Sequence, residues 1–404
     1  MDPSPCWATP WCGSADRVDL NFSAEDIAFR DTVRAFMAAN LSPETRRKVE
    51  EGRALDKADV VDWQRTLNTR GWATPSWPAA AGGPGWSAVQ RYIFMDELYA
   101  ACAPEPLSFN VSMIGPVLIT YGNEDQKARF LKATANLDIW WAQGFSEPGA
   151  GSDLAALSTT AVRDGDHYVV NGQKLWQGMA QRADWMFTLV RTDPTAPKKQ
   201  GGISFLLIDL KSPGVTIRPI ITIDGRHEVN EVFLDDVRVP VTDRIGEENQ
   251  GWTYAKYLLS NERTGIARIG MTRRVLARVE AALGDSAAGL SDIQKGQYAQ
   301  ESKAIDAELK ALEITQMRVL AAQQAGQADP RSSILKIKGV ELRQAASELL
   351  LRVTGPAGYA FVYEGDGEAP YEAASNYFTL RAASIYGGAS EVQKNIIASS
   401  VLGL

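Results

Sequence analysis

The sequence predicts an α+β protein in which a strand-rich region lies between two helical regions. Over about residues 23–135, and again after about residue 250, apolar residues recur at spacings of three and four, as on the buried face of a helix. Over about residues 138–246, short β-branched and aromatic runs alternate with Gly, Asp, Asn and Pro turns, as in strands. No helical pattern separates these runs, so we expect an antiparallel β domain and not a parallel, doubly wound sheet.

This pattern divides the chain into an N-terminal extension, a helical domain, a β domain and a second helical domain. They span residues 1–19, 20–137, 138–247 and 248–404. In the first helical domain, Gly71 is a suitable helix end and Asn123 a suitable N-cap. The strand-like runs of the β domain are HYVVNGQKLW, DWMFTLVRT, GISFLLIDL, GVTIRPI and NEVFLDDVRVP.

The last domain shows one long apolar stripe and an unusual final helix. The stripe residues are Ile305, Leu309, Leu312, Met317 and Leu320. Near the C-terminus, the segment EVQKNIIA predicts a helix, but Tyr386 and two adjacent glycines, Gly387 and Gly388, precede it. Because adjacent glycines do not favour a helix, this segment requires a separate explanation.

Composition excludes several classes of protein. The chain has 404 residues, 23% of them charged, and a net charge of −7, so nothing favours binding to nucleic acid or to an anionic membrane. No apolar run approaches the ~20 residues of a membrane span, and the N-terminus lacks the basic and apolar segments of a signal peptide. Three cysteines make no disulfide framework, which favours a reducing cytoplasm. With two histidines, His167 and His227, a His-rich metal site is excluded, and both are interpreted as solvated turn residues.

Three segments are candidates for chemistry, and each has a plainer interpretation. In GFSEPGAGSDLAAL, residues 149–152 are small, and their N–H groups are suited to a phosphate or a flat ring, although a surface turn is the simpler interpretation. In NGQKLWQGMAQRADW, Asn171-Gly172 predicts a hairpin turn, and Trp176 is either a core residue, which we favour from this segment alone, or a platform for an aromatic cofactor.

The third segment, LLSNERTGIARIG, places Glu262 and Arg263 in a predicted helix of small and apolar residues. Such a helix packs closely against its neighbours, and burial raises the pKa of a carboxyl group into the range useful for proton transfer. An ion pair within the chain explains the same residues equally well.

Taken together, these segments resemble the acyl-CoA dehydrogenase family. The resemblance lies in FSEPGAGSD, NGQKLW, EVF through VRVP, and YGGASEVQ, which occur in the family's order over nearly all of the chain after about Asp19. It implies that FAD binds between the β domain and a C-terminal domain of four-helix type. The implied cofactor-binding residues are Phe145, Ser146, Gly151, Ser152, Trp176, Gly178, Gly355, Gly358, Ser390 and Glu391.

The resemblance also implies removal of two hydrogens from Cα and Cβ of an acyl-CoA. Many family members carry the base directly after the tyrosine of the last motif, but Gly387 stands there. A second branch carries a glutamate before an arginine on another helix, which Glu262 and Arg263 match. Glu262 is therefore the expected base. The implied substrate-binding residues are Ser152, Arg263, Tyr386 and Gly387.

A finer resemblance is to large subunits of two-component enzymes of fatty acid metabolism, such as pimeloyl-CoA dehydrogenase. The chain lacks the family's Arg-x-x-Phe-Gly segment, which contacts FAD of a neighbouring subunit, so we expect a second, related subunit in an α2β2 heterotetramer. Electrons would pass to an electron-transferring flavoprotein. The acyl group is expected to be dicarboxylyl or medium-chain, with no residue identified that would bind a distal carboxylate.

Two departures from the family pattern leave alternatives open. Gly178 replaces a Ser or Thr that bonds the flavin, and Arg352 replaces a common glutamine. The alternatives are a biosynthetic relative that acts on an acyl-carrier-protein thioester, an oxidase, and a non-catalytic subunit of a heteromer.

Overall fold

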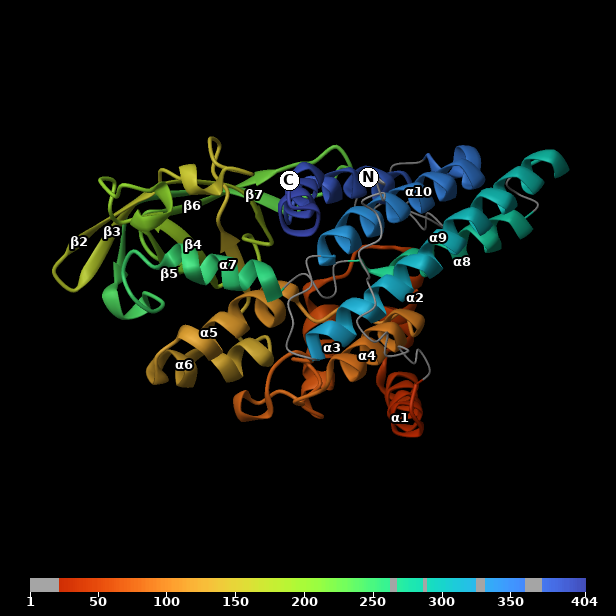
Figure 1. Cartoon of the computed structure of the whole chain (residues 1–404), viewed down its shortest axis with the longest axis horizontal. Helices are drawn as coiled ribbons and strands as arrows, with labels where there is room; N and C mark the ends of the chain where they lie inside the picture. The colour runs from red at the N-terminus through yellow and green to blue at the C-terminus, as the bar shows by residue number, and fades with distance from the viewer. Residues whose placement is uncertain (1–21, 262–266, 286–288, 325–330, 360–372) are drawn as a thin grey trace, which may run out of the picture.

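The computed structural model describes residues 22–261, 267–285, 289–324, 331–359 and 373–404. The extension 1–19 therefore lies outside the described residues. Figure 1 shows a twisted sheet at one end of the molecule and long helices at the other, with the N-terminal helices packed below both.

The N-terminal region is helical, as predicted. Its elements are α1 (Ala24–Asn40), α2 (Pro43–Glu51), α3 (Lys57–Asn68), α4 (Ala88–Ala100), a π-helical segment (Phe109–Ile114), α5 (Gly115–Tyr121) and α6 (Glu124–Ala135). Ser23, Ser87 and Asn123 start α1, α4 and α6 as N-caps, and each takes part in a capping box. The predicted Asn123 cap is thus confirmed.

The middle region forms one seven-stranded sheet. Its strands are β1 (Trp141–Gly144), β2 (Thr160–Asp164), β3 (His167–Gly178), β4 (Trp185–Arg191), β5 (Ile203–Asp209), β6 (Val215–Ile220) and β7 (Val229–Pro240). The order is β1-β4-β2-β3-β7-β6, with β5 also paired to β4. Pairing is antiparallel except that β4 runs parallel to β1 and β2, so the sheet is largely antiparallel as expected.

The predicted hairpin at Asn171-Gly172 is wrong, because β3 runs straight through both residues. The pairing of β3 with β7 shifts there, so that β7 contains one extra residue, and Asp236 adopts a positive φ of 49°. The Asn171 side chain donates to Asp236 Oδ1 (2.9 Å) and accepts from the Asp236 N–H (2.9 Å). The Asn-Gly pair therefore stabilises a bulge, and the observed hairpin of this region joins β2 to β3 at residues 165–166.

The C-terminal region is helical. It comprises α7 (Gly251–Asn261), α8 (Ile269–Gly284), α9 (Asp292–Gln324), α10 (Ser332–Gly358), α11 (Ala373–Arg381) and α12 (Ser390–Ile397). Of the predicted stripe on α9, Ile305, Leu309, Leu312 and Leu320 are buried, while Met317 is half-buried. The helix predicted across LLSNERTGIARIG does not run through Arg268, which has a left-handed φ of 46°, and α8 starts at Ile269. Residues 262–266 lie outside the described residues, so the helical placement of Glu262 and Arg263 stays a prediction.

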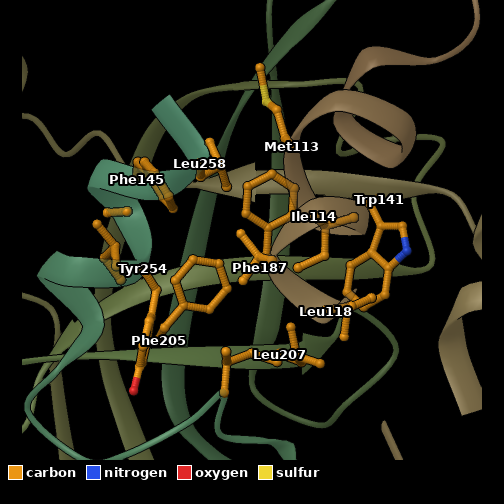
Figure 2. Close-up of a cluster of buried hydrophobic side chains, with 14 of the residues drawn as sticks. Met113, Ile114, Leu118, Trp141, Phe145, Phe187, Phe205, Leu207, Tyr254 and Leu258 are labelled. Carbon is orange, nitrogen blue, oxygen red and sulfur yellow. The ribbon is translucent and has the colours of Figure 1, made fainter. Parts of the chain in front are cut away.

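One core cluster joins all three regions (Figure 2). The sheet contributes Phe187 and Phe205, the π-helical segment contributes Ile114, and α7 contributes Tyr254 and Leu258. Because α7 packs against β4, β5, α5 and the π-helical segment, it holds the sheet and the N-terminal helices together.

Candidate functional site

A buried ion pair anchors the turn that follows β1. The Glu147 carboxylate accepts hydrogen bonds from Lys174 Nζ (2.9 Å), from the Ser158 N–H (2.7 Å) and hydroxyl (2.8 Å), and from the Thr159 N–H (3.0 Å). Burial alone would raise the pKa of Glu147, but the Lys174 charge and these hydrogen bonds hold the pKa at about 2. The Glu147 carboxyl group is therefore charged at neutral pH.

Lys174 completes this anchor from β3. Its side chain is 0% exposed, and Nζ also donates to the carbonyls of Leu189 (2.7 Å) and Phe145 (3.3 Å). Burial lowers the pKa of Lys174 to about 8 against the attraction of Glu147. This pair was not predicted from the sequence. The available signal was the strand period, which puts Lys174 on the same inward face as Tyr168 and Val170, where a lysine needs an acidic partner.

The anchor holds two predicted cofactor segments side by side. The Leu175 N–H donates to the Ser146 carbonyl (2.9 Å), and Gln177 Nε2 donates to the same carbonyl (3.1 Å). The turn itself closes through two hydrogen bonds between the backbones of Glu147 and Ala150 (2.9 and 3.1 Å). The fold therefore presents residues 145–152 alongside the end of β3.

A second bulge turns Trp176 outward. Lys174 pairs with Val232 but Gln177 pairs with Asn230, so β3 has one extra residue there, and Trp176 takes a φ of 66°. Without the bulge, the strand period would bury Trp176 on the face of Lys174. Instead Trp176 is 57% exposed, and the core interpretation favoured from this segment alone is wrong.

The glycines of the two predicted cofactor segments differ in the space around them. At Gly149 and Gly151 an added Cβ would meet nothing within 4 Å, so the chain's own packing does not require glycine there. At Gly178, an added Cβ would lie 3.0 Å from the Phe109 ring. Any side chain at position 178 would thus press on the π-helical segment, which gives a packing reason for the missing Ser or Thr.

The C-terminal motif is shaped by its glycines and by Lys336. Gly387 and Gly388 have φ of 64° and 86°, a conformation that side chains disfavour, and the predicted helix follows as α12. Lys336 Nζ donates to the carbonyls of Ala383 (2.9 Å) and Tyr386 (3.0 Å) and lies 5.1 Å from the Tyr386 ring centroid. Ser390 and Glu391, in the first turn of α12, follow directly.

The glycine-rich end of α10 is kinked. Gly355 has φ 55° and ψ −145°, and a Cβ at Gly358 would collide with Thr354. Arg352, the departure from the family's glutamine, forms an ion pair with Glu301 and lies over the Tyr298 ring. These residues belong to the C-terminal domain, whereas the residues around Trp176 belong to the sheet. The two domains are joined by bonds from Ser375 and Thr379 of α11 to Asp224 in the loop between β6 and β7.

A cavity of about 200 Å³ lies where the N-terminal and C-terminal helices meet. Val111 and Ser112 line it, and they follow Phe109, which contacts Gly178, so the cavity lies close to the end of β3. Its charged lining residues are Arg91, Asp96, Glu105, Arg268, Lys336 and Arg343. Among the predicted site residues that the structure describes, Tyr386 lines this cavity.

The region near the predicted base is closely packed, as expected. A Cβ on Gly270 would lie 2.5 Å from the Tyr99 ring, and one on Gly339 would lie 2.7 Å from the Ala267 backbone. Glu262 and Arg263 themselves lie outside the described residues. Shortly after them along the chain, Arg268, Ile269 and Gly270 line the cavity.

Asp96 on the wall of the cavity and Glu313 behind it share the cation Arg273. Arg273 contacts Asp96 (3.2 Å) and Glu313 (2.7 Å), and Glu313 also accepts from the Tyr92 hydroxyl (2.7 Å) and Lys310 (2.8 Å). Burial would raise the pKa of Glu313, but these partners hold it at about 2. Burial raises the pKa of Asp96.

No group of three or more His, Cys, Asp or Glu side chains in the described part of the chain is placed to hold a metal ion. None of the helices in the described ranges is both long and apolar enough to cross a membrane.

Family models match the chain in three consecutive parts. The N-terminal, middle and C-terminal domains of acyl-CoA dehydrogenase match residues 23–138, 142–237 and 249–402. The chain belongs to the acyl-CoA dehydrogenase family. It is an oxidoreductase that acts on CH–CH bonds, and the family consists of FAD-dependent flavoproteins.

Relatives and solved structures cover nearly the whole chain. It is 35% identical to acyl-CoA dehydrogenase IpdE1 of Mycobacterium tuberculosis over 93% of this chain and 97% of the relative. It is 32% identical to acyl-CoA dehydrogenase FadE26 of the same organism, over 95% and 98%. The Tcur3481-Tcur3483 steroid ACAD superposes with a TM-score of 0.84 at 30% identity, covering 96% of this chain and 99% of that one. The ChsE4-ChsE5 complex of M. tuberculosis gives a TM-score of 0.79 at 31% identity, covering 96% and 99%.

Proposed function

We propose that this acyl-CoA dehydrogenase removes a proton from Cα of an acyl-CoA thioester with the Glu262 carboxylate, while a hydride leaves Cβ. The acyl group is dicarboxylyl or medium-chain, and the enzyme works in the cytoplasm. One observation carries the proposal: the bulge in β3 exposes Trp176 beside an anchored small-residue turn, and a cavity of acyl size lies close to the end of the same strand.

The described residues fit FAD. An exposed indole offers a flat stacking surface, and the open space over Gly149 and Gly151 lets a bulky group approach the backbone N–H groups. We assign Phe145, Ser146, Gly151, Ser152, Trp176 and Gly178 to FAD from the sheet, and Gly355, Gly358, Ser390 and Glu391 from the C-terminal domain. FAD, when bound, supplies the acceptor for the hydride.

The chain's own residues supply orientation and the base. Tyr386 and Gly387, held by Lys336, are assigned to the substrate together with Ser152 and Arg263. Gly387 has no carboxylate to offer, so proton abstraction is assigned to Glu262. The Glu147–Lys174 pair acts indirectly, because it positions the Ser146 backbone and the strand that carries Trp176.

We also propose that the chain works as the large subunit of an α2β2 heterotetramer and passes electrons to an electron-transferring flavoprotein. The resemblance to a chain of the ChsE4-ChsE5 complex supports the first point. Co-expression with a second acyl-CoA dehydrogenase-like subunit should give a complex that contains two copies of each chain and stoichiometric FAD. A chain that binds FAD fully and turns over when purified alone would contradict the heterotetramer.

The test of the reaction is anaerobic addition of acyl-CoAs to the purified complex. The oxidised flavin band should bleach in the wild type, and Glu262→Gln should retain FAD while losing ~10²–10⁴-fold in rate, the contribution of a general base. Glu280→Gln, an exposed position on α8, is the matched control and should bleach normally. Full activity of Glu262→Gln removes the base assignment, and bleaching only with carrier-protein thioesters, or rapid peroxide formation, replaces the proposed reaction.

A further inference from the structure

Arg343 is a buried cation on the wall of the cavity. It lies on α10, lines the cavity and is 4% exposed. Its Nε is buried without a hydrogen-bond partner, and its guanidinium forms no ion pair with any residue that the structure describes. A buried guanidinium in this state is unfavourable unless something else in the site compensates its charge.

The acidic groups around the cavity are already engaged. Glu105 contacts Arg268 (3.5 Å) and accepts from the Tyr99 hydroxyl (3.1 Å). Asp96, on the other wall, is paired with Arg273. The two carboxylates among the described residues that line the cavity are therefore engaged with other cations, and neither forms an ion pair with Arg343.

From this we propose that Arg343 binds a carboxylate carried by the acyl group, so that the substrate is the monothioester of a dicarboxylic acid. The inference rests on the proposed function, because that function brings an acyl thioester to the cavity. A planar guanidinium offers two parallel N–H donors, which match the two oxygens of a carboxylate. Arg343 acts only in binding: it determines specificity and takes no part in proton or hydride transfer.

The size of the cavity favours the acyl group over the nucleotide end of CoA as the source of the anion. Pockets that enclose drug-sized ligands measure ~300–1,000 Å³. A cavity of about 200 Å³ is smaller than that and suits a short carboxylated chain, whereas the adenosine phosphates of CoA are larger than a typical drug fragment.

The experiment compares pimeloyl-CoA with heptanoyl-CoA, which has the same chain length and no distal charge, on the complete FAD-loaded complex. Wild type should prefer pimeloyl-CoA in kcat/KM by roughly 10- to 150-fold, the value of a hydrogen bond to a charged group. Arg343→Gln should lose this preference, because kcat/KM falls far more for pimeloyl-CoA than for heptanoyl-CoA, and Arg343→Lys should keep part of it. Lys338→Met removes an exposed cation from the same helix and should leave the preference unchanged.

A binding measurement makes the proposal independent of turnover. Pimeloyl-CoA should raise the melting temperature of the wild type more than heptanoyl-CoA does, and Arg343→Gln should abolish the difference. Equal wild-type responses to the two thioesters overturn the role of Arg343 but leave the dehydrogenase intact. An equal loss for both in Arg343→Gln also overturns it, since Arg343 then acts on the shared thioester. No flavin bleaching with any acyl-CoA instead overturns the proposed function itself.

Discussion

The sheet and the cavity both bury a cationic side chain, but they treat it differently. Under the turn after β1, Lys174 is fully buried and has three acceptors, one of them the Glu147 carboxylate. At the cavity, Arg343 is almost as deeply buried, yet its Nε has no acceptor. A buried charge with all its partners belongs to the framework, whereas one that faces a cavity unpaired is suited to a ligand.

The largest expected effect comes from breaking the framework pair. Lys174→Met should lower the free energy of unfolding by about 3–5 kcal/mol, because it leaves the Glu147 carboxylate buried without a countercharge. Urea unfolding of the wild type and variant measures this. The control is Lys127→Met, which removes an exposed pair with Glu124 and should cost at most about 1 kcal/mol. Equal effects of the two substitutions would show that burial of the pair is unimportant.

The Glu147–Lys174 pair should also make the free energy of unfolding depend on pH, with an effect of intermediate size. The pKa of Glu147 is lowered from 4.5 to about 2, so its contribution is fully present above pH 4.5 and is lost as the pH falls toward 2. The shift corresponds to about 3 kcal/mol. Unfolding measured between pH 6 and 3 should show the loss in the wild type and a shallower one in Glu147→Gln. Parallel curves for the two proteins would contradict the assignment.

Replacing Arg343 should change the free energy of unfolding in the opposite direction and by a smaller amount. Arg343→Leu should raise the free energy of unfolding of the ligand-free enzyme by about 1–3 kcal/mol, because an unpaired charge is replaced by an apolar group. The measurement is urea unfolding beside Lys174→Met under the same conditions. If both substitutions destabilise the protein to a similar extent, Arg343 also belongs to the framework and the contrast between the two regions disappears.

Much of the fold could be predicted because it depends on local periodicity. Helical spacing identified the helices that precede and follow the strands in the sequence, and capping chemistry identified the start of α6 at Asn123. The errors fall at irregularities of the backbone. Asn171-Gly172 was interpreted as a hairpin and Trp176 as core, since a bulge changes the strand phase by one residue and has no clear local signal.

Some residues of the candidate site could also be predicted from the sequence and others could not. The motif residues Ser146, Trp176 and Ser390 could be selected from the sequence, but nothing in it indicated that Glu147 and Lys174 meet across 27 residues. Likewise Arg343 sits in a helical pattern that gives no sign of a cavity, so the carboxylate-binding residue could not be chosen beforehand.

The sequence by itself determined the order of helices and strands, the family and the types of residue available for chemistry. These depend on side-chain spacing and short motifs, which are local properties. Only the tertiary structure decided which charges are neutralised, which aromatic ring faces outward and where a cavity remains. Those properties depend on distances between residues far apart in the chain, and at low dielectric a few ångströms separate a stabilising pair from a binding site.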